Sequence, residues 1–440
     1  MISVRCFDSL AAAAPLREDV NALNRRSVRP DPFSTFEFFE NFFRHDEFVS
    51  AGSGQPLWFL MAFRAGHLIG YLALREVSHK VMGLATRALG FLVTHDTDRP
   101  HVVARAEDLE HVTAAFCDYL IGRRREWSFL ELQQQDGTSS LFPPPPAVER
   151  AGYLVREWPS LENCTIHIRW DTLHDYFKAL SKRFRSNVSR QARALFGAGN
   201  VELLASADPV TNAAMFELYR CIEPHSWKAQ ANANIGRHPR RVEYFAGLLS
   251  ARQPMRVSIQ VLMLDGVPIA GLISGAFMGG LYALHIVYDD RVSRLGPGST
   301  MLLLGMRQAI NGRYAFFNLL SGFRYYKIRW LAEATETRIA QIYRAGSLAF
   351  WRRRFGDWKR RVLAAQSNPV SLLFNPARRE IDETVELVEP LAPGAVPQLA
   401  VTHAERERIT ALVNAVRNGQ GESLSAAQLA AVMPFETGRS

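Results

Sequence analysis

The sequence predicts an α/β protein in which one supersecondary unit occurs twice. Residues 58–74 and 259–274 each contain an apolar strand, a tight turn with glycine and a second apolar strand. Asp265-Gly266 at the second turn is a strong hairpin signal. Each hairpin is followed by a helical stretch and then a short aromatic strand, at 107–124 and 127–132 in the first copy and at 299–311 and 314–320 in the second. A chain of 440 residues is too long for one ordinary hydrophobic core. We therefore expect two domains, each with a mixed sheet.

Composition shifts suggest where the domains begin and end. We place the first domain at 1–160, with the stiff proline run 142–146 near its end, and the second at 161–365. Beyond them, prolines punctuate a polar stretch. Residues 366–440 are therefore expected to form a mostly irregular and helical tail, an appendage without chemistry, with helical patterns at 403–417 and 423–432.

Bulk composition narrows the class of protein. Hydrophobic residues make up 48% and charged residues 22%, which excludes disorder for most of the length. A net charge of +9 favours an anionic partner such as a CoA phosphate, a nucleotide-linked sugar, tRNA or an anionic membrane. The four cysteines are far apart, so we expect no disulfide framework, no zinc knuckle and no metal. With neither a signal peptide nor an apolar window of about 20 residues, the expected location is cytoplasmic.

A strand, a basic loop with glycines and a helix follow one another in the second half. The strand is 281–288, the loop is 289–295, and Gly296 and Pro297 open the helix. Free backbone N–H groups and the helix dipole attract phosphate at such a helix start. Arg294 or Arg291 would pair with phosphate oxygens. An ordinary turn is the alternative interpretation.

The loop Ser293-Arg294-Leu295-Gly296-Pro297-Gly298 resembles the pyrophosphate loop of the GNAT superfamily, which joins the fourth strand to the third helix. Both glycines match. Ser293 stands where glutamine or arginine is usual, and Arg294 is displaced by one position.

Short pieces in a consistent order resemble a bacterial acetyltransferase family associated with cellulose and exopolysaccharide biosynthesis. That family is related to the Fem-type aminoacyltransferases, which have two GNAT-like halves. The pieces are 31–39, 181–190, Glu223 with 226–228, 265–270, 288–289, 296–298, and Gly322 with 326–330. The resemblance implies two tandem GNAT-like domains, a degenerate first one and a second that holds the acyl-CoA site.

The same resemblance implies the donor site. In GNAT enzymes the donor lies where the fourth and fifth strands part, here 281–288 and 314–320. The residues implied to bind acetyl-CoA or another acyl-CoA are Ile286, Val287, Arg294, Leu295, Gly296, Pro297, Gly298 and Ser299. A tyrosine past the fifth strand often protonates the thiolate. Tyr326, or its neighbour Tyr325, has that place; packing beside Trp330 is the alternative for Tyr326.

Acyl transfer also needs a group that deprotonates the acceptor. Glu223, His225, His285 and Asp289 are the candidates. We favour Glu223, because His285 in an apolar strand suits a hydrogen-bonded core residue, while Asp289 either caps the turn or binds substrate. Trp227 and Lys228 are expected to bind the acceptor. Lys327 completes the catalytic group by binding an anionic acceptor or a CoA phosphate, unless it is a plain surface charge.

Two basic amphipathic stretches accompany this site. Apolar residues recur at helical spacing over 177–195, and six cations and no acid lie between Lys178 and Arg193. Such a face is either solvated or binds a phosphorylated acceptor, CoA, nucleic acid or membrane. Residues 348–362 combine tryptophan with arginine, which suits either an anionic membrane or a terminal helix that covers the second sheet.

The leading hypothesis is an acyl-CoA-dependent N- or O-acyltransferase that acts on a cell-envelope or exopolysaccharide precursor, with a sugar-linked or lipid-linked amine or hydroxyl as acceptor. Peripheral contact with the inner face of the membrane is compatible with it. One alternative is a Fem-like aminoacyltransferase that uses aminoacyl-tRNA; its long antiparallel helical arm has no counterpart in this sequence, and nucleic acid is not the expected partner. The other is a non-catalytic GNAT-like scaffold for envelope biosynthesis.

Overall fold

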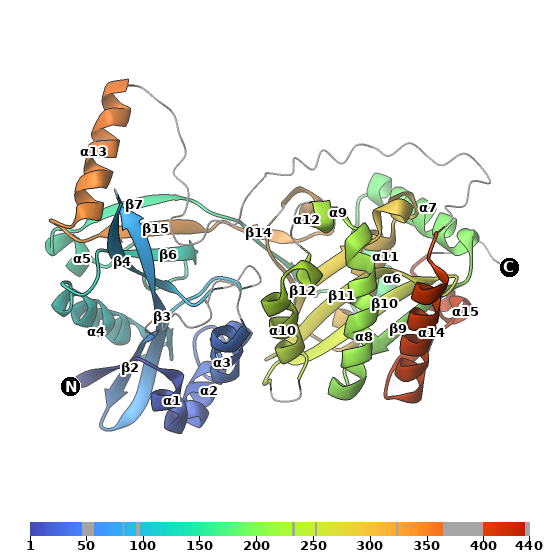
Figure 1. The fold of residues 1–440 in the computed structure, drawn as a ribbon, viewed down its shortest axis with the longest axis horizontal. Helices are drawn as coiled ribbons and strands as arrows, with labels where there is room; N and C mark the ends of the chain where they lie inside the picture. The colour runs from blue at the N-terminus through green and yellow to red at the C-terminus, as the bar shows by residue number, and fades with distance from the viewer. Residues whose placement is uncertain are drawn as a thin grey trace.

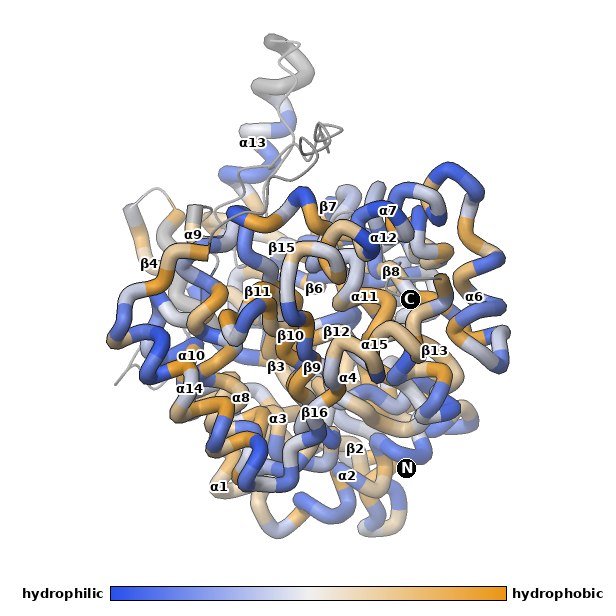
Figure 2. The backbone as a smooth tube through the Cα atoms, turned by 90° about the vertical axis from the view of Figure 1, so that its right-hand side faces the viewer, coloured by the Kyte–Doolittle hydropathy of each residue, from blue (hydrophilic) through white to orange (hydrophobic). Residues whose placement is uncertain are grey.

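The computed structural model describes residues 1–45, 57–81, 83–93, 97–230, 234–250, 253–322, 324–363 and 399–435. Two mixed sheets stand side by side in it, one per half of the molecule (Figure 1). The strands are largely apolar and the helices around them show polar stretches to the outside (Figure 2).

The first sheet runs in the order β1-β2-β3-β4-β6-β15-β7, with β5 paired to β3. Neighbouring strands are antiparallel except β4 and β6, which are parallel. The strands are β1 (Ile2–Phe7), β2 (Leu57–Arg64), β3 (His67–Val81), β4 (Leu84–Phe91), β5 (Val103–Ala104), β6 (Phe129–Gln135), β15 (Arg338–Tyr343) and β7 (Leu154–Pro159).

The second sheet runs in the order β16-β9-β10-β11-β12-β13-β8-β14. Here only β12 and β13 are parallel. The strands are β16 (Glu422–Leu424), β9 (Val201–Ser206), β10 (Arg256–Leu264), β11 (Val267–Phe277), β12 (Gly280–Tyr288), β13 (Phe316–Ser321), β8 (Asn163–His167) and β14 (Glu333–Thr335).

Apart from β5 and β16, the two sheets match strand by strand, which confirms the duplicated unit. In each, two antiparallel hairpin strands are followed by a third, then by a helix and a parallel strand. The predicted hairpins are β2–β3 and β10–β11. At the second turn Asp265 and Gly266 both have positive φ, 49° and 75°, as a tight hairpin turn of this type requires. The fold is thus α/β with two units of the same topology.

The two copies of the repeated unit exchange one strand each, and the exchanged strands occupy equivalent places in the two sheets. β8 follows the first copy (β1–β7) in the chain but lies between β13 and β14 of the second sheet, whereas β15 follows the second copy (β9–β14) but lies between β6 and β7 of the first. The orange β15 is visible among the teal strands in Figure 1. The two crossing segments are bonded to each other, since Ser160 N donates to Thr337 O at 2.8 Å. Neither 1–160 nor 161–365 therefore contains a complete sheet.

Helices cover both faces of each sheet. The α-helices are α1 (Leu10–Ala13), α2 (Arg17–Arg25), α3 (Phe36–His45), α4 (Leu109–Gly122), α5 (Pro146–Arg150), α6 (Leu173–Ala179), α7 (Lys182–Ala198), α8 (Pro209–Ile222), α9 (Trp227–Gln230), α10 (Pro239–Leu248), α11 (Pro297–Asn311), α12 (Arg324–Arg329), α13 (Leu348–Leu363), α14 (His403–Asn418) and α15 (Ala426–Val432). The 3-10 turns are η1 (Ala14–Leu16), η2 (Pro32–Ser34), η3 (Glu223–His225), η4 (Ile235–Arg237) and η5 (Asp290–Leu295).

One hydrophobic core spans both halves. Side chains of α2, α3 and the first sheet share a cluster with side chains of α8, α10 and the second sheet. At its centre Asn41 Nδ2 of α3 donates to Tyr244 O of α10 at 2.9 Å. Gly247 permits this approach, because a Cβ there would lie 1.9 Å from Asn41 Oδ1. The outer faces have separate cores, beneath α4 in the first half and beneath α7 and α11 in the second.

Two helical predictions needed correction. The stretch 177–195 is not one helix, because the backbone of Leu180 is extended (ψ 152°) and separates α6 from α7. The second basic stretch is helical as α13, yet it does not cover the second sheet. It follows β15 into the first half, where Ala349 and Phe350 are buried with Phe129.

The tail is also more integrated than an appendage. Within 399–435, α14 packs on α8 and buries Ile409, Val413 and Val416 in the shared core. β16 adds a strand beside β9, and Leu429 of α15 is fully buried. The expected irregular stretch 366–398 lies outside the described residues.

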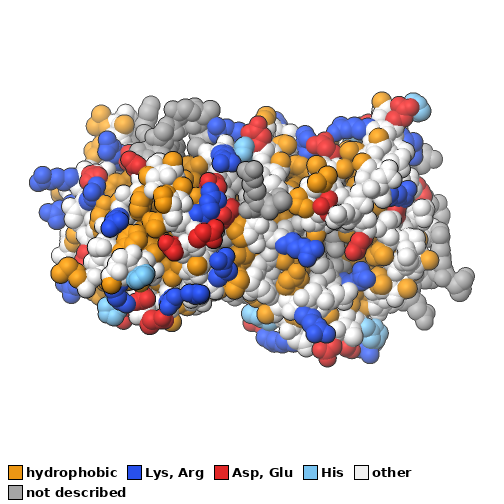
Figure 3. Space-filling model, turned by 90° about the horizontal axis from the view of Figure 1, so that it is seen from below, with side chains coloured by type: hydrophobic (Ala, Val, Ile, Leu, Met, Phe, Trp, Pro, Cys, Tyr) orange, Lys and Arg blue, Asp and Glu red, His pale blue; other side chains and the backbone are white. Residues whose placement is uncertain are grey.

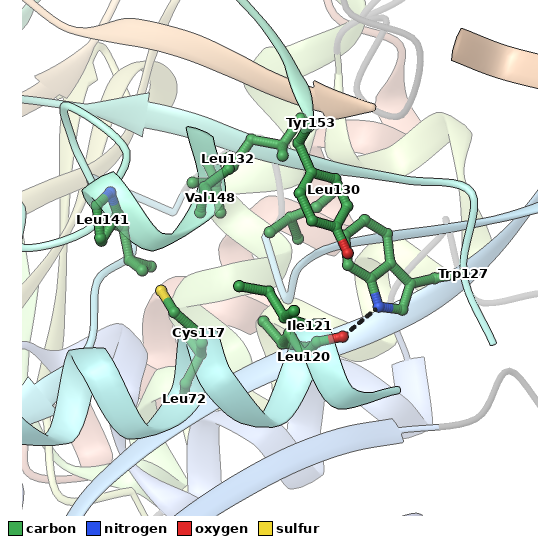
Figure 4. A pocket seen from close by; sticks show the side chains of 12 residues that line it. Leu72, Cys117, Leu120, Ile121, Trp127, Leu130, Leu132, Leu141, Val148 and Tyr153 are labelled. Carbon is green, nitrogen blue, oxygen red and sulfur yellow. Dashed lines mark hydrogen bonds between the residues drawn. The ribbon is translucent and has the colours of Figure 1, made fainter. Parts of the chain in front are cut away.

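A small apolar cavity lies between α4, α5 and the first sheet (Figure 4). Its volume of about 30 Å³ suits roughly one water-sized molecule. Trp127 closes one side, donating from Nε1 to Leu120 O at 3.1 Å and stacking on Tyr153. Burial raises the pKa of Cys117, which lines the cavity, to about 12, so this thiol is no nucleophile near neutral pH. The cavity is lined by apolar side chains and belongs to the first half of the molecule.

None of the helices in the described ranges combines the length and the apolar character needed to cross a bilayer.

The place of β15 in the first sheet can be tested at Ile342, which belongs to this strand and is 4% exposed. Ile342→Ala should lower the free energy of unfolding by about 2–4 kcal/mol, because it opens a cavity in a packed core. Hydrogen exchange measured by mass spectrometry should speed up in β6 and β7, which are far away in the sequence.

Ile328→Ala, at a 41% exposed position, is the control and should change stability by less than about 0.5 kcal/mol. Faster hydrogen exchange in the second sheet alone would contradict the placement of β15 in the first sheet.

Candidate active site

The turn after β12 is held by a buried aspartate and ends in a left-handed glycine. Asp289 is 0% exposed; its carboxylate accepts the amide of Arg291 at 2.9 Å and the guanidinium of Arg291 at 2.6 Å. η5 follows and closes at Gly296, with φ 63° and ψ 42°, a conformation that favours glycine. Asp289 therefore caps the turn. Its predicted substrate-binding role is wrong, because the carboxylate is buried and committed.

α11 begins at Pro297 without a side-chain cap from any described residue. Pro297 occupies the first helical position, as predicted. Gly298 and Ser299 follow in the first turn and are half-buried. Amides of a first turn have no partner within their own helix, and the positive end of the helix dipole lies at the same place. This helix start can bind an anion.

Neighbouring side chains lie against both loop glycines. A Cβ on Gly296 would come within 2.7 Å of Gln191 Oε1, and one on Gly298 within 2.9 Å of the Tyr288 ring. Gly296 is buried and lets α7 pack closely. Gln191 Oε1 is buried, and no described residue hydrogen-bonds it.

The other loop residues divide by exposure. Leu295 and Pro297 are buried, so only their backbone is available to a ligand, whereas Arg294 is exposed. Arg291 is engaged with Asp289 and also donates to Ala400 O at 3.2 Å. Of the two arginines considered for a phosphate, Arg294 is the one not held by this pairing.

β12 and β13 part soon after they meet. Their parallel pairing comprises Gly280–Phe316, Leu281–Phe317 and Tyr282–Asn318. The rest of β12 keeps its pairing with β11, with one extra residue, Leu284, between the pairs of Ala283 and His285. Such a bulge bends a strand locally. Ile286 is half-buried and Val287 is buried beyond the point of parting.

A chain of three polar side chains lies on the α8 side of β12. Tyr219 Oη is 2.6 Å from His285 Nδ1, and Lys228 Nζ is 2.8 Å from His285 Nε2. A lysine ammonium only donates, so Nε2 accepts and Nδ1–H donates to the phenol oxygen. Tyr219 is fully buried and Lys228 is half-buried, so the chain leads from the core toward the surface.

The environment of His285 keeps its ring neutral. Burial, and then the positive charges of Lys228 and Arg241, hold the pKa of His285 well below its usual value. His285 is thus the hydrogen-bonded core residue that its apolar strand suggested. Its function here is to hold Lys228, whose Nζ also lies 5.8 Å from the centre of the half-buried Trp227 ring.

Glu223 is a structural carboxylate. It is 1% exposed, and its two oxygens accept the amides of Ile235 (2.7 Å) and Gly236 (2.8 Å). The predicted role as general base is therefore wrong, since both oxygens are spent on the η4 turn. The sequence around Glu223 could not show that a turn twelve residues later folds back onto it. His225 is exposed beside it.

Lys327 joins α12 to the end of β13. It is 3% exposed, and Nζ donates to the carbonyls of Leu319, Leu320 and Ser321 at 2.8, 3.0 and 3.1 Å. Its predicted contact with an external anion is wrong, because the ammonium is buried among these carbonyls. Tyr326, whose ring centre lies 6.0 Å from Lys327 Nζ, is half-buried, whereas Tyr325 is 70% exposed.

The first half reaches the place where β12 and β13 part. Asn318 Nδ2 donates to Asp98 Oδ2 of the first half at 3.0 Å, and Asn318 Oδ1 accepts from Asn163 Nδ2 at 3.0 Å and from Leu320 N at 2.8 Å. Arg99 pairs with Asp98 at 3.2 Å. The side chains of Asn318, Asn163 and Asp98 are polar, and all three residues are at least nine-tenths buried.

η2 of the first half packs on the same region. Phe33 meets the Tyr282 ring edge-on, with 6.0 Å between ring centres. Asp31 caps η2 by accepting from Phe33 N and Ser34 Oγ. Burial raises the pKa of Asp31 to about 6. The piece 31–39, which sequence analysis noted without assigning a role, thus borders the candidate site.

Sequence reasoning missed Tyr219, Gln191, Asn318 and Asp98. Each occupies an ordinary position in a helix, strand or loop, and its partner is far away along the chain. Nothing in a single sequence marks such residues, because their contacts arise only when the halves and layers pack.

In the described part of the chain, no group of three or more His, Cys, Asp or Glu side chains is placed to hold a metal ion. The cysteines are free thiols, and burial raises the pKa of Cys6, Cys117 and Cys221.

Comparison with known proteins agrees with this geometry. Residues 182–328, about a third of the chain, match the family model described as an acetyltransferase (GNAT) domain. The match runs from the start of α7 through the loop of Gly296 to α12. No curated protein matches the chain.

Solved structures of low similarity share the general architecture. FemX is 11% identical, with 74% of this chain and 95% of that chain covered and a TM-score of 0.49. The C-terminal domain of a putative lysylphosphatidylglycerol synthetase from Agrobacterium fabrum is 13% identical, with 80% and 97% covered and a TM-score of 0.46. A tandem GNAT protein from the clavulanic acid biosynthesis pathway is 10% identical, with 79% and 99% covered and a TM-score of 0.42. These scores carry no argument about function. Residues 182–328 thus match a GNAT acetyltransferase domain on a sheet whose parallel strands part beside an uncapped helix, and this match supports an acyltransferase.

Proposed function

We propose that the protein transfers an acyl group, acetyl in the simplest case, from acyl-CoA to an amine or hydroxyl of a cell-envelope or exopolysaccharide precursor. The observation that carries this proposal is the uncapped start of α11 beside the parting of β12 and β13. When bound, acyl-CoA supplies an activated thioester carbonyl. The acceptor class rests on the family resemblance of the sequence.

The donor is held by backbone more than by side chains. The amides of Gly298 and Ser299 and the dipole of α11 face the diphosphate, and the exposed Arg294 adds a positive charge. Ile286 and Val287 line the parting strands, where the pantetheine arm would run. Tyr326 is the proton donor for the thiolate.

The acceptor binds on the α8 side of the sheet, at Trp227 and Lys228. The Lys228 ammonium is held by the neutral His285, which is itself held by Tyr219. Fixing a charged group in advance lowers the cost of ordering it when an anionic acceptor binds. The half-buried position strengthens the ion pair relative to one in open solvent.

Acetyl-CoA binding provides the direct test of the donor site, and Ser299→Glu is the decisive variant. A carboxylate in the first turn of α11 favours the helix dipole, so the free protein should keep its melting temperature. The same charge repels a diphosphate, so the Kd for acetyl-CoA should rise at least about tenfold. Thermal shift with and without acetyl-CoA measures both quantities.

Ser299→Gln is the matched neutral control and should retain most of the shift. Equal binding of acetyl-CoA by the two variants would show that the diphosphate does not lie at the start of α11. Absence of any shift in the wild type, with acetyl-CoA or longer acyl-CoAs at millimolar concentration, would reject the proposed function. Binding without turnover on any amine or hydroxyl acceptor would favour the scaffold alternative.

Lys228→Met should raise the KM for an anionic acceptor by about ten- to a hundredfold, because it removes a charge-assisted contact. The Kd for acetyl-CoA should change little, since Lys228 is assigned to the acceptor alone. Tyr219→Phe, which leaves the His285 Nδ1–H without its acceptor, should give a smaller rise in the same KM. A change in the Kd for acetyl-CoA of the same size would contradict the assignment.

His285 should also make stability depend on pH. Its pKa is lowered in the folded chain and is about 6.5 in the unfolded chain, so the unfolded state binds more protons below about pH 6.5. Stability is therefore present above that pH and is lost as the pH falls, by at most about 1.4 kcal/mol per pH unit for this group.

Urea unfolding of the wild type and of His285→Gln between pH 7.5 and 5.5 measures this effect. The variant should lose less stability on acidification, by about 1 kcal/mol, whereas the exposed His225→Gln should follow the wild type. Parallel curves for the wild type and His285→Gln would show that His285 is not held neutral.

A further inference from the structure

α13 presents three large aromatic side chains to solvent on one side. Trp351, Phe355 and Trp358 are 58%, 63% and 57% exposed. Their spacing of four and three residues places them in one stripe along the helix. Exposed apolar surface of this size on one element marks a site of interaction.

The opposite side of α13 is docked, so the stripe is not a consequence of a loose helix. Phe350 is buried in a cluster with Tyr343 of β15. Asp357 binds Arg156 of β7 at 2.7 Å, and the Arg353 guanidinium lies 5.1 Å from the centre of the Trp158 ring. These contacts fix the rotation of the helix and leave the aromatic stripe outward. α13 also stands away from the rest of the fold in Figure 1.

Exposed positive charge lies beside the stripe, at Arg352 and Arg354. The one acid of the helix, Asp357, is committed to Arg156 and Arg353. The helix α7, in which Lys182, Arg183, Arg190 and Arg193 are exposed, lies toward the same side of the molecule as α13 in Figures 1 and 2.

The underside of the molecule has a different character. There, acidic and basic side chains are interspersed across both halves (Figure 3). The charge on that face is thus mixed, whereas the exposed charge beside the aromatic stripe of α13 is positive.

We propose that α13 docks the protein on an anionic lipid bilayer. Tryptophan and phenylalanine enter the boundary between headgroups and acyl chains, and the arginines pair with lipid phosphates. Cations near such a surface are attracted by its negative potential. The stripe is amphipathic and positively charged at its edges, which complements this surface better than a purely apolar protein partner. The helix lies on the membrane and does not span it.

Flotation of the full-length protein with lipid vesicles tests the docking. Vesicles of phosphatidylcholine with about 30% phosphatidylglycerol are compared with pure phosphatidylcholine, at low and at high salt, without acyl-CoA. Binding is expected to the anionic vesicles and should weaken with salt, since the charges are exposed. Without acyl-CoA in the assay, the result is independent of the proposed acyl transfer.

Two sets of variants separate the aromatic and the charged contributions. The triple variant Trp351→Ala, Phe355→Ala, Trp358→Ala should lower the partition coefficient at least tenfold. Arg352→Gln with Arg354→Gln should lower it severalfold and flatten the salt dependence. Matched controls remove exposed side chains elsewhere: Val28→Ala with Val210→Ala for apolar area and Arg124→Gln with Arg125→Gln for charge. Both controls should bind as the wild type does, and melting curves confirm that every variant is folded.

Three outcomes would overturn the proposal. The triple variant floats like the wild type, the wild type binds neutral and anionic vesicles equally, or the wild type is a dimer in sedimentation that the triple variant dissociates. The last result would assign the stripe to a second copy of the chain.

Discussion

The exchange of β8 and β15 is the constraint on which the rest of the structure depends. Each exchanged strand lies inside the sheet that receives it, so its removal would leave the outermost strand (β7 or β14) unpaired and open one edge of the inner strand (β6 or β13). The crossing segments are tied by the Ser160–Thr337 hydrogen bond. Because the chain passes in both directions between the sheets, the halves cannot separate or rotate freely without breaking ladders in both. The relative position of first-half and second-half residues at the candidate site follows from this.

Polar contacts at the boundary become meaningful once the halves are fixed. Asn318 uses its amide in both directions, toward Asp98 of the first half and toward Asn163 of the exchanged β8. Buried polar groups of this kind are costly unless each is satisfied, so they define one arrangement more sharply than apolar packing does. Asn318 is also the last residue of β13 paired with β12. The point where the two strands part is thus held by residues from three segments distant in sequence.

Local signals in the sequence were sufficient for the repeated elements. The hairpin at Asp265-Gly266, the helix start at Pro297 and the strand 281–288 depend on turn chemistry and short-range periodicity, and the structure has all three. Side-chain roles that depend on distant partners could not be read in the same way. The Glu223 carboxylate accepts amides twelve residues later, and the Lys327 ammonium donates to carbonyls of the preceding strand. α13 packs on the first sheet because β15, the strand before it in the chain, belongs to that sheet. Glu223 and Lys327 lie within sequence motifs that suggested chemistry, but in the folded chain both side chains have structural roles.

The two halves differ in chemistry at equivalent positions, although they share a topology. α4 of the first half corresponds to α11 of the second, but it begins with Asp108, which Arg64 binds at 2.5 Å, and has Glu110 in its first turn. Acidic groups at a helix start satisfy the dipole and disfavour a second anion there. The helix start of α11 has glycine and serine at the corresponding place and no side-chain cap from the described residues. Of these two equivalent helix starts, α11 is thus the one without an acidic residue in its first turn. The first half instead contributes Phe33 and Asp98 to the region where β12 and β13 part.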